Sequence, residues 1–211
     1  MTETDERAPK RKRYNSRIIT LQVGKEPETI TIHEDNLRQS SQFFRAALDR
    51  HWREGTSGEI RLPEDHVEIV SAYVDWLYRG TCMEDCLNED GDYVCEMWQT
   101  LAKMYVFGEK IQDARFSNVV LARMLDYIDK SGSSPGELAI RTVYEGTTVH
   151  SPVRQLLVAI WAAKAKGEWF KSIEEYPEEF LMDLAMKLVR LRGKAKYPPW
   201  TEHKNTWMKP E

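Results

Sequence analysis

The sequence predicts an α+β fold, in which a small three-stranded sheet is followed by helices that pack against it. Residues that alternate between apolar and polar are confined to the first third of the 211 residues, and apolar residues at helical spacing fill most of the remainder. Turn residues separate the two kinds of segment. Strands that precede helices in this way are typical of an α+β arrangement rather than of a doubly wound parallel sheet.

The sheet is predicted from three short runs. Apolar residues alternate over residues 19–23 and again over 30–32, and the turn residues between these runs indicate a β-hairpin. A third strand is expected at Ile60 and Leu62, after two glycines, and Pro63 ends it.

The helices of the N-terminal half are predicted from apolar residues three and four positions apart, together with their start and stop signals. Two short helices follow the hairpin, and Ser41 stands where the second one needs an N-cap. Pro63 is expected to open the next helix, which Gly80 ends as a left-handed cap. Two longer helices are expected from residue 94 and after Asp113.

Three further helices are predicted in the C-terminal part. Ser134 and Glu137 have the spacing of a capping box, with Pro135 at the first helical position. The other two helices are expected to begin at residues 151–152 and at Pro177. Because these helices are amphipathic, they are expected to dock on the preceding domain.

Four segments result from this pattern. We expect a disordered basic tail at 1–16, an α+β domain at 17–128, a helical extension at 129–193 and a flexible tail at 194–211. The two central segments hold the predicted strands and helices.

Composition and charge favour an intracellular protein, cytoplasmic or nuclear, that binds neither nucleic acid directly nor membranes. With 41% hydrophobic residues the chain can bury a core, and its net charge of -4 offers no general attraction to phosphate groups. No apolar run reaches the roughly 18 residues needed to cross a bilayer. Cys82, Cys86 and Cys95 are an odd number without a fourth zinc ligand nearby, so we interpret them as free thiols in a reducing compartment.

One short run of the N-terminal tail is basic. Lys10, Arg11, Lys12 and Arg13 fit a nuclear-import signal, and they fit equally a solvated tail with no such role. Both interpretations stay open at this point.

Motifs that would indicate an enzyme, a metal site or a cofactor are not found in the sequence. A metalloprotease needs two metal-binding histidines four positions apart on a helix. Four positions after His33 the sequence has Leu37, so this motif is not present. Phosphate-binding glycine loops and the nucleophile elbow of serine hydrolases are also missing. We therefore expect no catalysis and no cofactor. Convergence of His33, His66 and an acidic residue in one closed pocket would indicate an enzyme instead.

Several short segments resemble, in the right order, the BTB/POZ domain family. IHEDNLRQSSQFF, residues 32–44, matches the family's pattern of a strand ending in His, a Leu, a Ser and an aromatic pair. IRLPED at 60–65, YVDWLYRG at 73–80 and LAKMYVFGEKIQDARF at 101–116 are similar to later parts of the domain. With its helical extension, the chain resembles fungal BTB-domain proteins over residues 17–128.

The resemblance implies a small sheet surrounded by helices that serves protein–protein association. Members of the family dimerise, recruit corepressors or bind a cullin scaffold as adaptors of a ubiquitin ligase. The usual dimer exchanges an amphipathic helix ahead of the first strand, and residues 1–16 lack the apolar stripe for it. A homodimer is therefore left open, but not by that exchange.

Cullin-binding members carry a hydrophobic-x-Glu motif after the helix with the aromatic pair, and here Trp52, Arg53 and Glu54 stand at that place. We expect these three, with Phe44 and Leu48, to bind a partner. Trp52 would be an apolar anchor and Glu54 a hydrogen-bond acceptor. In the alternative interpretation Trp52 packs on its own domain and Glu54 is solvated.

The sequence thus favours an interaction adaptor with a BTB-like domain, with the adaptor subunit of a cullin ubiquitin ligase as its specific form. Its alternative is a nuclear regulatory factor, in which the basic run directs import and the BTB surface recruits a corepressor complex.

Overall fold

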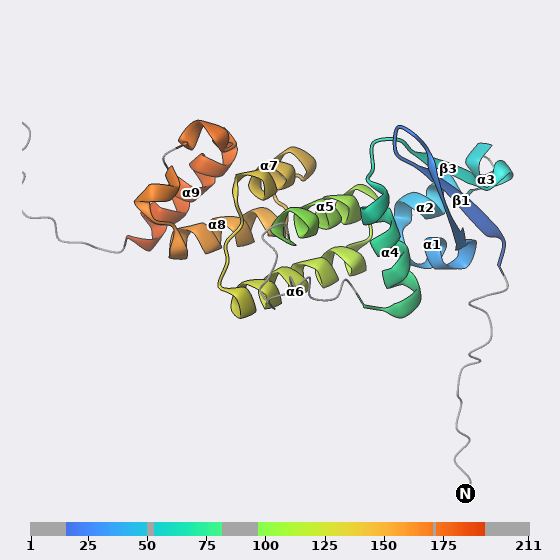
Figure 1. Ribbon diagram of the computed structural model, residues 1–211, viewed down its shortest axis with the longest axis horizontal. Helices are drawn as coiled ribbons and strands as arrows, with labels where there is room; N and C mark the ends of the chain where they lie inside the picture. Colours follow the sequence, from blue (N-terminus) through green and yellow to red (C-terminus); the bar gives the residue numbers. More distant parts are fainter. Residues whose placement is uncertain (1–15, 50–52, 82–96, 171, 193–211) are drawn as a thin grey trace, which may run out of the picture.

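The computed structural model (Figure 1) describes residues 16–49, 53–81, 97–170 and 172–192. Residues 1–15 of the expected N-terminal tail, the expected C-terminal tail and the three cysteines lie outside these ranges. Ser16, the last residue of the expected N-terminal tail, lies inside them, and its hydroxyl accepts a hydrogen bond from the Asp35 N–H over 3.2 Å. Within them the chain has an α+β fold with a three-stranded sheet and a helical extension, as the sequence predicts.

The sheet is a hairpin with one further strand added in parallel. Strands β1 (Ile18–Val23) and β2 (Glu28–His33) pair antiparallel, with Ile19 opposite Ile32. Strand β3 (Glu59–Leu62) pairs parallel with β1, so β1 is central and the order is β2-β1-β3. The alternating residues of β1 are buried on one face, as the period-two pattern predicts.

Four helices follow or interrupt these strands: α1 (Glu34–Ser40), α2 (Gln42–Ala47), α3 (Arg53–Ser57) and α4 (Val67–Arg79). Ser41 caps α2 as predicted, since its hydroxyl accepts a hydrogen bond from the Phe44 N–H over 3.1 Å. Gly80 ends α4 in the left-handed conformation, with φ of 75°.

The predicted start of α4 is wrong. Pro63 does not open α4, which begins at Val67 after His66 as its N-cap. A turn separates the strand from the helix instead, because the Asp65 N–H donates to the Leu62 carbonyl over 3.3 Å.

Two long helices form the centre of the molecule: α5 (Met97–Lys110) and α6 (Ala114–Ser131). Helix α6 begins directly after Asp113, as predicted. The Asp113 carboxylate caps it by accepting a hydrogen bond from the Phe116 N–H over 3.0 Å. Helix α6 continues past residue 128, so the predicted boundary between 128 and 129 falls inside it.

The C-terminal helices continue from α6 and pack against α5 and against each other. They are α7 (Glu137–Gly146), α8 (Pro152–Lys164) and α9 (Glu178–Leu191), with two short 3₁₀ turns at Gly167–Phe170 and Ile173–Glu175. The docking expected for these helices is confirmed. The sheet and α9 lie at opposite ends of the molecule (Figure 1).

The predicted capping box of α7 is wrong. Gly136 is the N-cap, and no side chain caps this helix. The Pro135 carbonyl accepts a hydrogen bond from Trp161 Nε1 over 3.0 Å, so this segment is fixed by packing against α8. Tertiary contact thus decides the start of α7 in place of local capping.

The core around Tyr73 joins the sheet to the central helices. Its ring stacks on Phe44 and meets the rings of Phe107 and Phe116 edge to face. Its hydroxyl donates to Asp113 Oδ2 over 2.9 Å. Among the described residues, no helix is long and apolar enough to cross a membrane.

Candidate protein-binding groove

A groove of about 490 Å³ lies between α2, α3 and β3, next to the place where the sequence predicts a partner site. We refer to it as the α2–α3–β3 groove. The residues that line it are Phe43, Ala46 and Ala47 from α2, Glu54 and Ser57 from α3, and Glu59, Ile60 and Arg61 from β3. Small and apolar side chains of α2 thus face charged side chains of α3 and β3.

The apolar side of the groove depends on the aromatic pair in α2. Phe44 is fully buried, whereas Phe43 remains 36% exposed and lines the groove. The two rings meet edge to face with centroids 5.2 Å apart, so the buried ring fixes the exposed one. The Phe43 N–H also donates to the Ile111 carbonyl over 3.3 Å, which ties this helix to the end of α5.

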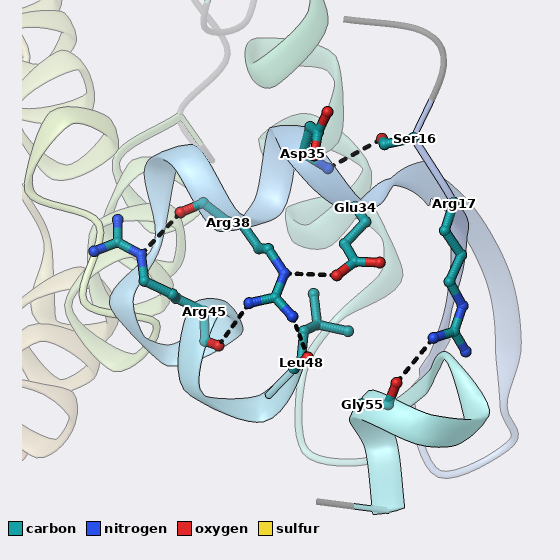
Figure 2. A network of polar contacts seen from close by, with 8 residues as sticks. All are labelled: Ser16, Arg17, Glu34, Asp35, Arg38, Arg45, Leu48 and Gly55. Carbon is teal, nitrogen blue, oxygen red and sulfur yellow. Dashed lines mark hydrogen bonds and ion pairs between the residues drawn. The ribbon is translucent and has the colours of Figure 1, made fainter. Parts of the chain in front are cut away.

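Helix α2 is held at its C-terminal end by Arg38 of α1 (Figure 2). The Arg38 Nε contacts Glu34 Oε1 over 2.6 Å, and the guanidinium also donates to the backbone carbonyls of Arg45 and Leu48. Carbonyls at the C-terminal end of a helix have no partner within the helix, so a guanidinium group that donates hydrogen bonds to them stabilises that end. The position of the groove's α2 side is therefore fixed by α1.

Helix α3 is short, and the Arg17 side chain helps to hold it in place. Arg17 donates from Nη1 to the Gly55 carbonyl over 2.8 Å (Figure 2). Its Nη2 donates to the Thr56 carbonyl over 2.9 Å. A Cβ atom added at Gly55 would lie 2.1 Å from the Asp49 carbonyl oxygen, so only glycine lets α3 approach the chain after α2 this closely.

Charged side chains and a strand edge complete the groove. Glu54 is half-buried, and Arg61 contacts Glu59 over 3.4 Å at the surface. In the described sheet, β3 pairs with β1 alone, so its other edge has no strand partner. Edge strands with an apolar groove beside them are sites where another polypeptide can bind.

The structure places the five predicted partner-binding residues differently. Glu54 lines the groove, and Arg53 begins α3. Phe44 and Leu48, with 0% and 1% of their surface exposed, belong to the core, so the prediction that they contact a partner is wrong. The predicted anchor Trp52 lies outside the described residues, as does the basic run from Lys10 to Arg13.

Sequence reasoning missed the residues that form and support the groove. Phe43, Ala46 and Arg61 line it, and Arg17 holds one of its sides. A signal for Phe43 was present, because adjacent residues on a helix point about 100° apart and both rings cannot face one core. No local pattern pairs Arg17 with a carbonyl 38 positions away.

The two histidines whose convergence would indicate an enzyme lie at different places. His33 lies within 2.6 Å of the Tyr78 hydroxyl through Nδ1, whereas His66 lines a separate hollow beside Asp65 and Lys110. Over the described ranges, no group of three or more His, Cys, Asp or Glu side chains could hold a metal ion.

Comparison with known proteins assigns no family to this chain. No family model matches the sequence, and a search of curated proteins finds no match either.

Proposed function

We propose that this chain is a protein–protein interaction adaptor that binds its partner in the α2–α3–β3 groove. The observation that carries the proposal is the groove itself, in which an exposed aromatic ring and two alanines face Glu54. Apolar contact area beside a few fixed polar groups is typical of protein-binding sites. Glu54, which lines the groove, is also the glutamate of the segment that resembles the hydrophobic-x-Glu motif of cullin-binding BTB domains.

The residues that line the groove define the kind of segment that fits it. An apolar side chain of the partner would pack between Phe43 and the alanines, where it leaves water. Glu54 and Glu59 would accept hydrogen bonds from a basic side chain or from backbone N–H groups of the partner. The unpaired edge of β3 adds backbone donors and acceptors for an extended segment.

Within this class we propose a cullin scaffold as the partner, which would make the chain a substrate adaptor of a ubiquitin ligase. The proposal is supported by the place of Trp52, Arg53 and Glu54 in the sequence, a few residues after α2, and by Glu54 lining the groove. The helices after residue 131 would then offer the surface for a second protein.

Binding of a purified cullin scaffold tests this assignment. We expect Trp52→Ala and Glu54→Ala to weaken binding by about 10-fold or more, because anchors at the centre of an interface dominate its affinity. The matched control is Glu145→Ala, an exposed glutamate on α7 away from the groove, which should bind normally. Equal binding by all four proteins would contradict the cullin assignment.

A further inference from the structure

Helix α9, at the end of the molecule away from the groove, has an apolar face turned to solvent. Phe180 and Leu184 are buried against α8 and α7, with 0% and 3% of their surface exposed. On the opposite side Met182, Met186 and Val189 are 63%, 53% and 58% exposed, and Ala185 between them is exposed as well. We call these four residues the outer stripe.

The spacing of the outer stripe is that of a helix contact surface. Positions 182, 185, 186 and 189 follow the i, i+3, i+4, i+7 pattern, which brings them onto one face. A helix that is apolar on two opposite sides is normally covered on both. Two of the four are methionines, whose flexible side chains are common at binding surfaces.

The charges along α9 indicate what covers this stripe. Glu178 and Glu179 stand in its first turn, whereas Lys187, Arg190 and Arg192 stand near its end. Glu179 pairs with Arg154 over 2.6 Å, and Asp183 accepts from the Tyr144 hydroxyl over 2.8 Å. For the side chains of Glu178, Arg190 and Arg192, the described part of the chain provides no ion-pair partner.

We propose that a second copy of this chain packs on the outer stripe, with the two α9 helices antiparallel. Glu178 and Arg192 are 14 positions apart, about 21 Å along the helix, and Ala185 lies halfway between them. A two-fold axis at Ala185 therefore brings each Glu178 beside Arg192 of the other copy. It also brings Met182 of one copy near Val189 of the other.

The antiparallel direction follows from charge and from size. In a parallel pair like charges would face each other at both ends, which is destabilising, and the helix dipoles would also be aligned unfavourably. Ala185 has the smallest side chain of the stripe, so the helices can approach most closely at the axis. One helix pair buries less surface than a permanent interface, so the dimer dissociates on dilution.

This inference does not depend on the proposed function, but it has a consequence for it. Because α9 and the sheet lie at opposite ends (Figure 1), a dimer through α9 leaves both α2–α3–β3 grooves accessible. The dimer would then bind two partner molecules, or one partner at two sites with increased avidity.

Sedimentation equilibrium of the full chain, over a concentration range up to about 300 µM, tests the proposal. We expect a reversible monomer–dimer equilibrium. Met186→Lys should weaken the dimer by about 100-fold or more, since it places an unpaired charge in an apolar contact. The control is Leu125→Lys, because Leu125 is 45% exposed on α6, outside the stripe, and its replacement should leave the equilibrium unchanged.

A charge exchange tests the direction of the two helices. Glu178→Arg and Arg192→Glu should each weaken the dimer by about 10-fold, since each creates two repulsive pairs. The double variant should restore the affinity to within about 3-fold. The proposal would be overturned if the unaltered chain is a monomer at every concentration. It would also be overturned if the double variant does not recover the dimer affinity that the two single variants lose. A chain that dimerises only after residues 193–211 are removed would overturn it as well, because its own C-terminal residues would then be what covers the stripe.

Discussion

Arg17 donates from Nη1 to the backbone carbonyl of Gly55 over 2.8 Å, and this contact ties the start of β1 to the short helix α3. The two residues are 38 positions apart. Since α3 carries Glu54 and Ser57 into the α2–α3–β3 groove, the shape of the groove depends on Arg17 although Arg17 does not line it.

Replacing Arg17 should therefore affect partner binding more than stability. We expect Arg17→Ala to lower the free energy of unfolding by about 1 kcal/mol, because its two hydrogen bonds lie at the surface, and to weaken partner binding by about 10-fold. Urea denaturation and a binding assay measure the two effects. Arg79→Ala is the control, since Arg79 lies away from the groove and its ion pair with Asp75, over 3.8 Å, is exposed. Normal binding by Arg17→Ala would show that α3 holds its position alone.

Gly55 should tolerate no side chain. We expect Gly55→Ala to destabilise the protein by about 1–3 kcal/mol, because the new Cβ would overlap the Asp49 backbone and force α3 away from α2. Gly136→Ala is a matched control, since a Cβ there meets nothing within 4 Å. Thermal or urea denaturation of both variants would reveal the difference. Equal stability of the two would contradict the close approach of α3.

The hydroxyl of Tyr73 should contribute to stability through Asp113. Both residues are fully buried, and the hydrogen bond of 2.9 Å joins α4 to the N-cap of α6. Tyr73→Phe leaves the Asp113 carboxylate without this donor, so we expect a loss of about 1.5–3 kcal/mol in urea denaturation. Tyr176→Phe is the control, because the Tyr176 hydroxyl makes no hydrogen bond to the described residues. We expect this variant to leave the free energy of unfolding almost unchanged. An unchanged free energy of unfolding in Tyr73→Phe would contradict this contribution.

Stability should fall in alkaline solution. Burial, together with the neighbouring carboxylates of Asp113 and Asp183, raises the pKa of Tyr73 and of Tyr144 above the usual range. In the unfolded chain both ionise near pH 10, so the folded state retains protons that the unfolded state loses. The stabilisation is complete below about pH 10 and declines above it, by about 1.4 kcal/mol per pH unit for each tyrosine. Urea midpoints between pH 8 and 11 measure this decline, and Tyr73→Phe should reduce it.

Local patterns predicted the parts of the fold that short-range physics decides. The alternation in β1 and β2 indicated the hairpin, Ser41 caps the helix it was expected to cap, and α6 begins after Asp113 as expected. Pro63 was misjudged because a proline after a strand fits a turn as well as a helix start. The start of α7 depends on Trp161, far along the chain, and no capping pattern contains that information.

The groove was predicted only in part, for similar reasons. The position of Glu54 could be expected from the chain following α2, but the direction of Phe43 and Phe44 depends on which ring Tyr73 stacks against. Leu48 packs in the core, and its carbonyl accepts a hydrogen bond from Arg38 of α1. Contacts of this kind join residues on different elements, so they emerge only with the tertiary structure.

The most direct measurement of the central proposal is affinity purification of the chain from cells with Ala46→Arg compared against Ala122→Arg. Both alanines are exposed on helices, but only Ala46 lines the groove, so only the first arginine fills it. We expect the proteins retained by the unaltered chain to be retained by Ala122→Arg and lost by Ala46→Arg. Retention of the same proteins by both variants would contradict partner binding in the α2–α3–β3 groove.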